Sequence, residues 1–289
     1  MLLSLQLAMG AACAANSRWR RVSKSRELNI SGMAVVGNNE QRTTFVVVHD
    51  NKSIKDPHAG LVTVGHGNAP RYTPLEWLGE DVPVDLEAIS SVPGDAKSFL
   101  ALTSAGKVYQ VWVDIGNDRI EVVRTFFVPS IPAESNFEGL SLETIDGVLI
   151  VVWAESGFSA KPATLYWGVF DLQTRVFSRV GSAVIKVPYP TADVRHISDL
   201  KIESNGEVLV SSAADPDPDG PFASAIYSIG TLSFADGEVV VFKQAMPPKQ
   251  LYSFPDHKVE ALESVPGKNG GRAFGSDDED LGAAIYLDW

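Results

Sequence analysis

The sequence predicts an all-β fold, a five-bladed β-propeller, and two observations support this fold class. First, five short segments share one pattern: a large apolar residue, then Ser or Glu, then a small or acidic residue, then another large apolar residue. They recur about every 50 to 60 residues, which is typical of a four-stranded blade. They are Ile30-Ser31-Gly32-Met33, Leu86-Glu87-Ala88-Ile89, Phe137-Glu138-Gly139-Leu140, Ile197-Ser198-Asp199-Leu200 and Val259-Glu260-Ala261-Leu262. Second, after Ala15 the chain shows no helical periodicity of useful length.

The first two blades are predicted from short β-branched runs. Blade 1 extends from about Leu28 to Pro83 and contains a continuous β-branched run at 43–48, as expected for a strand buried on both faces, and a second strand at 60–64. Blade 2 begins at Asp85 and shows four strands separated by tight turns with Gly, Pro, Asn and Asp. We expect these strands at 85–92, 98–103, 107–113 and 119–127.

Blades 3 and 4 repeat this plan. Blade 3 begins at Asn136, with further strands expected at 148–154, 164–171 and 176–187. Blade 4 begins at Arg195, with strands at 207–212, 224–229 and 238–244 and a long acidic loop at 215–220. Turns such as Asp146-Gly147 and Ser204-Asn205-Gly206 separate the strands.

Blade 5 begins at Lys258 and has only three strands, of which the last is 283–289. Propellers commonly close the ring with a strand from the opposite terminus, which removes an open sheet edge. Residues 17–25, with Trp19 and Val22, are the natural closing strand. Residues 16–289 are therefore predicted to form one domain.

The composition limits the partners and leaves the compartment open. A formal net charge of −12 argues against nucleic acid and anionic membranes, because phosphate binding needs clustered Lys and Arg. Cys13 is the only cysteine, so no intramolecular disulfide forms.

The apolar run 1–15 ends in small residues as a secretory signal does, but no basic residue precedes it. A short packed helix and an unstructured leader are the alternatives, so the protein is secreted or periplasmic in the first case and cytoplasmic otherwise. The run is too short to span a bilayer, and we expect a monomer.

The Ser or Glu of the repeated pattern predicts a cation site. If each segment begins the innermost strand of its blade, these five side chains surround the central channel, and three carboxylates on one axis must be protonated or hold a cation. Carboxylate and hydroxyl oxygens favour Ca²⁺, with Mg²⁺ or Mn²⁺ as second choices. The alternative is a wet channel in which the glutamates bond to backbone amides or water. The predicted ligands are Ser31, Glu87, Glu138, Ser198 and Glu260.

The loops expected around the channel mouth supply further candidates. Glu87 and His49 are the candidate general bases, and His196 and His257 are weaker ones. The cations best placed to hold an anionic group of a small-molecule substrate are Lys52, Arg195 and Lys258. We interpret the acidic loops 215–219 and 277–280 as ordinary turns. Phe158 and Phe222 either line a pocket at the rim or pack in the core, and four tryptophans are expected between blades: Trp77, Trp112, Trp153 and Trp167.

The order Ser, Glu, Glu, Ser, Glu around five blades resembles the calcium-activated nucleotidase (apyrase) family. Blade 4 is similar to the matching blade of that family through the segments 197–202 and 225–227. The resemblance implies a five-bladed propeller with one Ca²⁺ in its central cavity, held by the five Ser and Glu residues named above. It does not extend to phosphate handling, because Thr103-Ser104-Ala105-Gly106 stands where the family has an acidic, Arg-containing turn.

Other propellers share parts of the pattern. The segments at 85–89 and 137–140 resemble blade starts of phytase-like and lactonase-like propellers, in which a Glu-bound Ca²⁺ polarises the substrate. Five-bladed glycoside hydrolases place acid and base carboxylates on innermost strands, but they usually begin blade 1 with Asp-Pro, where this chain has Asn29-Ile30. The sequence therefore predicts a Ca²⁺-dependent hydrolase or lyase acting on a small anionic or oxygen-rich substrate. The alternative is a non-catalytic binding module with a structural ion.

Overall fold

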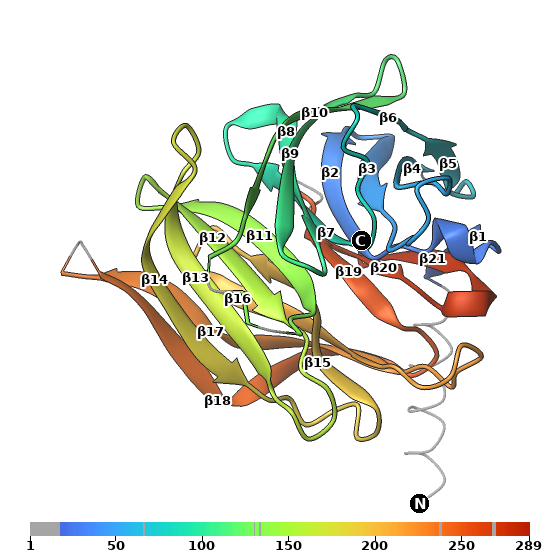
Figure 1. Cartoon of the computed structure of the whole chain (residues 1–289). Helices are drawn as coiled ribbons and strands as arrows, with labels where there is room; N and C mark the ends of the chain where they lie inside the picture. Colours follow the sequence, from blue (N-terminus) through green and yellow to red (C-terminus); the bar gives the residue numbers. More distant parts are fainter. Residues whose placement is uncertain (1–17, 66, 130, 133, 237–238, 268–269) are drawn as a thin grey trace, which may run out of the picture.

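The computed structural model describes residues 18–65, 67–129, 131–132, 134–236, 239–267 and 270–289. The chain forms five β-sheets arranged as the blades of a propeller, which confirms the predicted fold class (Figure 1). Within these residues there are two short 3-10 turns and no α-helix, and no helix is long and apolar enough to cross a membrane. The apolar run 1–15 lies outside the described residues.

Three of the blades have four strands that follow chain order from the channel outward. Blade 1 consists of β2 (Gly32–Asn38), β3 (Arg42–Val48), β4 (Ala59–Gly65) and β5 (Arg71–Pro74). Blade 3 consists of β11 (Phe137–Ile145), β12 (Val148–Glu155), β13 (Ala163–Asp171) and β14 (Val176–Ile185). Blade 4 consists of β15 (Val194–Ile202), β16 (Glu207–Ala214), β17 (Ser224–Ala235) and β18 (Val239–Phe254).

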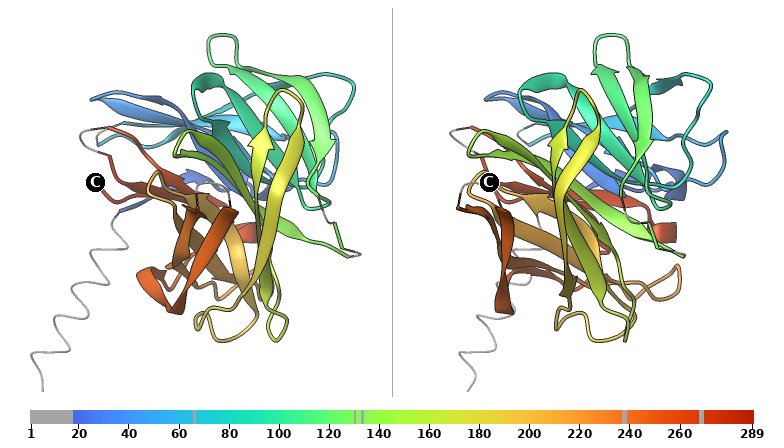
Figure 2. Two further views of the ribbon diagram at one scale, coloured as in Figure 1. Left: turned by 90° about the vertical axis from the view of Figure 1, so that its left-hand side faces the viewer. Right: turned by 60° about the vertical axis from the view of Figure 1, so that its left-hand side comes forward.

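Blade 2 has one strand more than the repeat predicts. Its four antiparallel strands are β7 (Leu86–Val92), β8 (Asp95–Thr103), β9 (Lys107–Asp114) and β10 (Arg119–Phe127). The short strand β6 (Glu76–Leu78), from the connection after blade 1, pairs in parallel with β10. Two views from other sides show the same five sheets (Figure 2).

The N-terminal strand closes the ring, as predicted. Blade 5 contains β19 (Val259–Ser264), β20 (Arg272–Ser276) and β21 (Ala283–Leu287). Strand β1 (Trp19–Ser23) pairs antiparallel with β21, and Trp19 lies opposite Tyr286 (Figure 1). The closing strand completes the fourth position of the blade, so the ring is held by hydrogen bonds between the two ends of the propeller.

The hydrophobic core is divided among the interfaces between neighbouring blades. Trp153 is fully buried with residues of blades 2 and 3, and Trp167 packs with residues of blades 3 and 4. Trp77 packs in the same way between blades 1 and 2. Trp112 is 49% exposed, so its predicted place between blades is wrong. Its neighbours Val111 and Val113 face that interface, and the alternation of a strand turns Trp112 outward.

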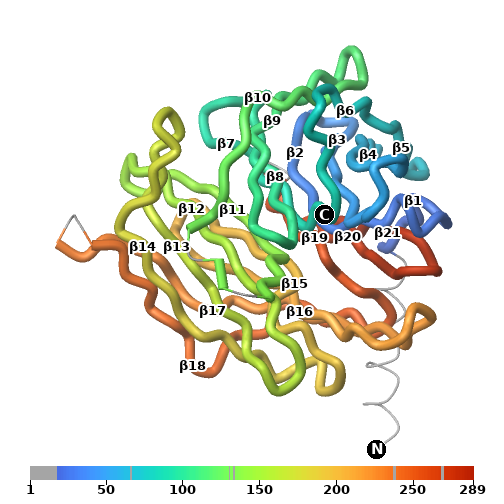
Figure 3. The backbone as a smooth tube through the Cα atoms, viewed as in Figure 1, coloured from blue at the N-terminus to red at the C-terminus, as the bar shows by residue number. Residues whose placement is uncertain are grey.

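The outer strand of blade 4 also differs from the prediction. β18 continues to Phe254, ten residues past the expected end at Gln244 (Figure 3). Residues 239–244 pair with the second half of β17 and residues 249–254 with its first half, with a register shift between the two parts.

Close packing explains the small residue in the repeated pattern. A Cβ atom on Gly32 would lie 2.7 Å from the Cα atom of Ala88 in blade 2, and one on Gly139 would lie 2.8 Å from Cγ of Leu200 in blade 4. The inner strands approach so closely around the channel that the position after the ring residue has little room. The pattern therefore records the geometry of the channel wall.

Candidate functional site

The five predicted ring residues all belong to innermost strands or directly precede them, and all are buried. Glu87, Glu138 and Glu260 are the second residues of their strands, Ser31 precedes β2, and Ser198 lies in the middle of β15. As whole residues, Ser31, Glu138, Ser198 and Glu260 are at most 2% exposed, and Glu87 is 7% exposed. The strand pairing is interrupted by a β-bulge at each of the three glutamates. Bulges re-aim side chains and are common beside functional sites.

Backbone hydrogen bonds bring the predicted loops to one end of the channel. The amide of Phe137 donates to the carbonyl of Ser104 at 3.0 Å, and the amide of Ile197 donates to that of Ser156 at 3.1 Å. The amide of Ile30 donates in the same way to Ser276, at 3.2 Å. In each case the start of one innermost strand is tied to the loop after the second strand of the preceding blade. These loops therefore share a face, as the sequence predicts.

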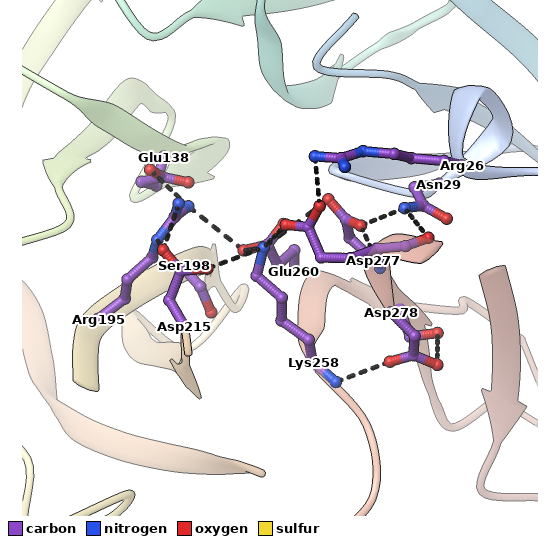
Figure 4. A network of polar contacts seen from close by, with 12 residues as sticks. Arg26, Asn29, Glu138, Arg195, Ser198, Asp215, Lys258, Glu260, Asp277 and Asp278 are labelled. Atoms are coloured by element: carbon purple, nitrogen blue, oxygen red, sulfur yellow. Dashed lines mark hydrogen bonds and ion pairs between the residues drawn. The ribbon is translucent and has the colours of Figure 1, made fainter. Parts of the chain in front are cut away.

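A row of charges with alternating sign crosses this face through blades 3, 4 and 5 (Figure 4). Nη1 of Arg195 lies 2.9 Å from Oε1 of Glu138 and 3.3 Å from Oε1 of Glu260. Nζ of Lys258 lies 3.3 Å from the same oxygen of Glu260 and 2.7 Å from Oε1 of Glu279. Two of the three ring carboxylates are thus neutralised by cations of the protein itself.

Asp215 joins the two cations from the loop after β16. One of its carboxylate oxygens lies 2.9 Å from Nη2 of Arg195, and the other lies 3.2 Å from Nζ of Lys258. Burial alone raises the pKa of Asp215, but Arg195 and Lys258 outweigh it and hold this pKa below its usual value. Burial opposes the charge of Lys258, yet Glu260 and Asp277 raise its pKa. Both cations therefore stay charged in the neutral pH range.

The third ring carboxylate, that of Glu87, is not neutralised by a cation within the part of the chain that the structure describes. Among the described residues Glu87 forms no ion pair, and the buried hydroxyl of Ser31 has no hydrogen-bond partner. Burial raises the pKa of Glu87 well above its usual value, and the nearby charges of Glu138 and Asp50 raise it further. Without a bound cation this carboxyl group is protonated over a wider pH range than an exposed glutamate.

Asp50 adds a second carboxyl group with a raised pKa. It follows β3 and has a pKa of about 6, raised by burial and then by the charge of Asp277. Its neighbour Asp85 accepts a hydrogen bond from Ser104 and lies 3.7 Å from Nζ of Lys52. Glu87 and Asp50 are therefore two buried carboxyl groups of this face with raised pKa values, and that of Asp50 lies near neutral pH.

His49 is better explained as a link within the fold than as a base. It is 1% exposed, its Nδ1 is 2.5 Å from the carbonyl oxygen of Asn29, and its Nε2 is 3.0 Å from the hydroxyl of Tyr72. Burial lowers its pKa to about 4. Both ring nitrogens are occupied by contacts within the protein, and the catalytic role of His49 stays a prediction. His196 is held in a similar way, since its Nε2 contacts the carbonyl oxygen of Ser159 at 3.0 Å.

The three cations expected to hold a substrate are in different environments. Lys258 is almost fully buried among carboxylates, so it positions side chains of the protein and is not available to a ligand. Arg195 is 21% exposed at its side chain and reaches a pocket, while Lys52 is 80% exposed and only loosely paired. Of the three predicted cations, only Arg195 is both ordered by the site and open to solvent.

The acidic loops contribute more than the sequence indicates. Asp278 accepts hydrogen bonds from the amide of Lys258 at 2.8 Å and from Nδ1 of His257 at 2.7 Å. Asp277 accepts a hydrogen bond from Asn29, and Glu279 holds Lys258. The interpretation of 277–280 as an ordinary turn is therefore wrong. A usable signal was present, because these carboxylates directly follow the second strand of their blade.

The donor set allows a divalent cation on one side of the ring only. Glu138 and Glu260 are paired with Arg195, whose positive charge disfavours a cation beside them. The hydroxyl of Ser198, on the same side, donates to the carbonyl oxygen of Val259 at 2.9 Å. The oxygen atoms away from Arg195 are those of Ser31 and Glu87, with Asp50 nearby. In the part of the chain that the structure describes, no three His, Cys, Asp or Glu side chains are grouped as a metal site. A hard cation fits the orphaned hydroxyl and the unpaired carboxyl group, with water completing its coordination.

A pocket opens beside the row of charges, between blades 3 and 4. Its volume is about 240 Å³, and its lining includes Asn136, Phe158, Lys161, Arg195 and Asp215. Of the two alternatives for the phenylalanines, Phe158 lines this pocket and is 47% exposed, whereas Phe222 is buried in the core. The pocket thus exposes Arg195 and Asp215 of the row of charges to solvent.

Comparisons with known proteins reach the fold and no further. No protein-family model matches the chain, and no curated protein sequence is significantly similar to it. A solved glycoside hydrolase is similar in structure with a TM-score of 0.52 at 10% identity, over 90% of this chain and 61% of that one. An exo-1,5-α-L-arabinanase from a bovine ruminal metagenomic library gives 0.51 at 10% identity, over 89% and 91%. A GH43 endo-arabinanase from Bacillus licheniformis gives 0.50 at 10% identity, over 93% and 97%.

These structures define the protein as a five-bladed propeller of the architecture that glycoside hydrolases use. The chain spans about three fifths of the length of the first of them. At 10% identity the likeness concerns the fold alone. The resemblance to the calcium-activated nucleotidase family is not supported, because the three similar structures named above are glycoside hydrolases.

Proposed function

We propose that this protein is a hydrolase that acts at the acidic mouth of the propeller channel on a small, oxygen-rich substrate, with a divalent cation bound beside Glu87. The observation that carries the proposal is the divided ring. Arg195 and Lys258 hold Glu138 and Glu260, while the buried Glu87 has no ion pair within the described part of the chain. Its environment is that of a group prepared for proton transfer or for a cation.

Asp50 supplies the proton-transfer chemistry, while Glu87 is the ligand of the cation. Glu87 and Asp50 have raised pKa values, whereas Arg195 and Lys258 keep Asp215 ionised. Enzymes that use acid and base together depend on such a separation of pKa values. Asp50, with a pKa of about 6, accepts a proton from water or from the substrate near neutral pH. Asp215 stays charged and fixes the two cations of the row.

A divalent cation would be held by Ser31 and Glu87, with water completing its coordination, and Ca²⁺ is the first choice for oxygen donors. When bound, such an ion polarises an oxygen of the substrate. The protein itself orients the substrate through Arg195, whose guanidinium reaches the pocket between blades 3 and 4.

Turnover of chromogenic substrates tests the proposal. Aryl glycosides, lactones and phosphate esters are supplied to the full chain in Ca²⁺ or in EDTA, and at least one class is hydrolysed in Ca²⁺. Because general acid–base catalysis contributes about 10²- to 10⁴-fold, Asp50→Asn lowers kcat at least about 100-fold. Asp217→Asn removes an exposed charge from the same face and serves as the matched control. Absence of turnover for all three classes in Ca²⁺ contradicts the proposal.

The row of ion pairs favours one second candidate, a non-catalytic binding module. The row connects blades 3, 4 and 5 at distances of 2.7 to 3.3 Å and so stabilises the ring whether or not chemistry takes place. In that case Ca²⁺ raises the melting temperature, and no substrate class is hydrolysed.

A further inference from the structure

We propose that the pocket between blades 3 and 4 is a subsite for one hydroxyl-bearing ring, of the size of a single sugar residue, with Phe158 as its stacking surface. The inference rests on the proposed function for its place in a reaction, but its binding test does not. Pockets that hold drug-sized ligands have volumes of about 300 to 1,000 Å³. At about 240 Å³ this pocket takes a smaller group.

The stacking surface belongs to a well-held hairpin. The amide of Phe158 donates to the carbonyl oxygen of Lys161 at 2.8 Å, and the amide of Lys161 donates back at 2.9 Å. The amide of Ser159 donates to the carbonyl oxygen of Val194 in blade 4 at 2.8 Å, and its own carbonyl oxygen is contacted by His196. The backbone that carries Phe158 is therefore fixed before any ligand arrives, which lowers the entropy cost of stacking.

A tight approach at Gly157 supports the same conclusion. Gly157 has φ +61°, and a Cβ atom there would lie 2.4 Å from the backbone nitrogen of Ala163. No other residue fits without displacing the hairpin. The turn that presents Phe158 to the pocket therefore requires glycine at position 157.

The polar groups around the pocket suit hydroxyl groups better than a phosphate or a nucleobase. Glu155 and Asp215 accept hydrogen bonds, while Arg195 and Lys161 donate them. Asn136 contributes its side-chain oxygen as an acceptor, because its amide nitrogen donates to Glu138 and Ser156. This mixture offers both donors and acceptors to hydroxyl groups, which are donors and acceptors at once. A nucleobase would use the aromatic face but few of the acceptors, and a phosphate would use the two cations but meet two carboxylates.

Hydrogen bonds connect the subsite directly to one of the Ser and Glu side chains around the channel. Nδ2 of Asn136 donates to Oε1 of Glu138, and Arg195 holds the same oxygen at 2.9 Å. A ligand that touches Asn136 and Arg195 is therefore placed next to a carboxylate of the channel wall. Arg195 thus connects the pocket to the row of charges. Of the three predicted cations, it is the one that is both held by the site and exposed to solvent.

Ligand NMR tests the subsite without any need for turnover. D-glucose, D-xylose and L-arabinose are titrated separately into the full chain, with adenosine and inorganic phosphate as competing ligand classes. We expect at least one sugar to bind. Since aromatic contacts contribute about 0.5 to 1.5 kcal/mol, Phe158→Ala weakens its Kd about three- to tenfold. Phe127→Ala, which removes a ring that is 58% exposed on blade 2, is the matched control and leaves the Kd unchanged.

The results separate the subsite from the catalytic proposal. No sugar binding, or an equal Kd for the wild type and Phe158→Ala, overturns the subsite even if the protein hydrolyses another substrate. Binding of adenosine or phosphate in place of the sugars also overturns it. Sugar binding that depends on Phe158, together with no turnover in Ca²⁺, leaves the subsite standing and removes the hydrolase.

Discussion

Replacing Arg195 tests the row of charges most severely. Arg195→Met keeps much of the side-chain volume but removes the guanidinium that lies 2.9 Å from Glu138 and 3.3 Å from Glu260. The side chains of these two glutamates are only 1% and 3% exposed, so water does not replace the lost partner. Breaking a buried ion pair by removing one partner costs about 3 to 5 kcal/mol. For a domain of this size that corresponds to a melting temperature lower by about 6 to 10 °C.

The loss depends on pH in a defined direction. Burial raises the pKa of Glu138 and of Glu260, and Arg195 opposes this in the wild type. In Arg195→Met both pKa values rise further, so the two groups are neutral at low pH and the variant loses stability as the pH rises through their new pKa values. Thermal melting in EDTA from pH 4 to pH 8 measures this. A deficit that is small at every pH, or that does not grow with pH, refutes the row of charges as described.

Three further changes have expected outcomes. Asp50→Asn in EDTA raises the free energy of unfolding by about 1 to 3 kcal/mol at pH 8 and leaves it unchanged at pH 4. The reason is that Asp50 has a pKa of about 6 in the folded protein, so the wild type loses stability as the pH rises through that range. A pH-independent difference in melting temperature contradicts this. Gly157→Ala places a side chain at φ +61° and costs about 1 to 3 kcal/mol, so it lowers the melting temperature by several degrees. An unchanged melting temperature contradicts the requirement for glycine at this turn. Deletion of residues 1–24 removes β1 and exposes the edge of β21. Light scattering then shows aggregation, or calorimetry shows a melting temperature well below that of the wild type. A monomer of wild-type stability contradicts closure of the propeller by β1.

The fold was predictable because each blade begins with the same short sequence pattern. The apolar, Ser or Glu, small, apolar segment marks every innermost strand, and the missing fourth strand of blade 5 points to the N-terminal segment. The close approach of Gly32 to Ala88 shows why the small position is retained in the pattern. The additional strand β6 was not predictable in this way, because its pairing with β10 depends on where a connecting segment passes and not on the repeat.

The candidate site was predictable in its residues and not in its pairings. The sequence identifies Glu138, Arg195 and Glu260 as channel residues, but the contacts among them join positions 57 and 65 apart in the chain. Only the closure of the ring decides which of these side chains meet. The charge argument for a central Ca²⁺ counted three carboxylates and did not include the two cations that lie among them.

Calcium titration of the metal-free protein by calorimetry tests the central claim, a cation site on the unpaired side of the ring. We expect one Ca²⁺ to bind to the wild type, and Glu87→Gln to weaken this binding at least tenfold, because the substitution removes the one buried ring carboxylate without an ion pair among the described residues. Glu138→Gln, whose carboxylate Arg195 already holds, weakens binding less. No Ca²⁺ binding by the wild type, or equal affinities for the wild type and Glu87→Gln, contradicts the account.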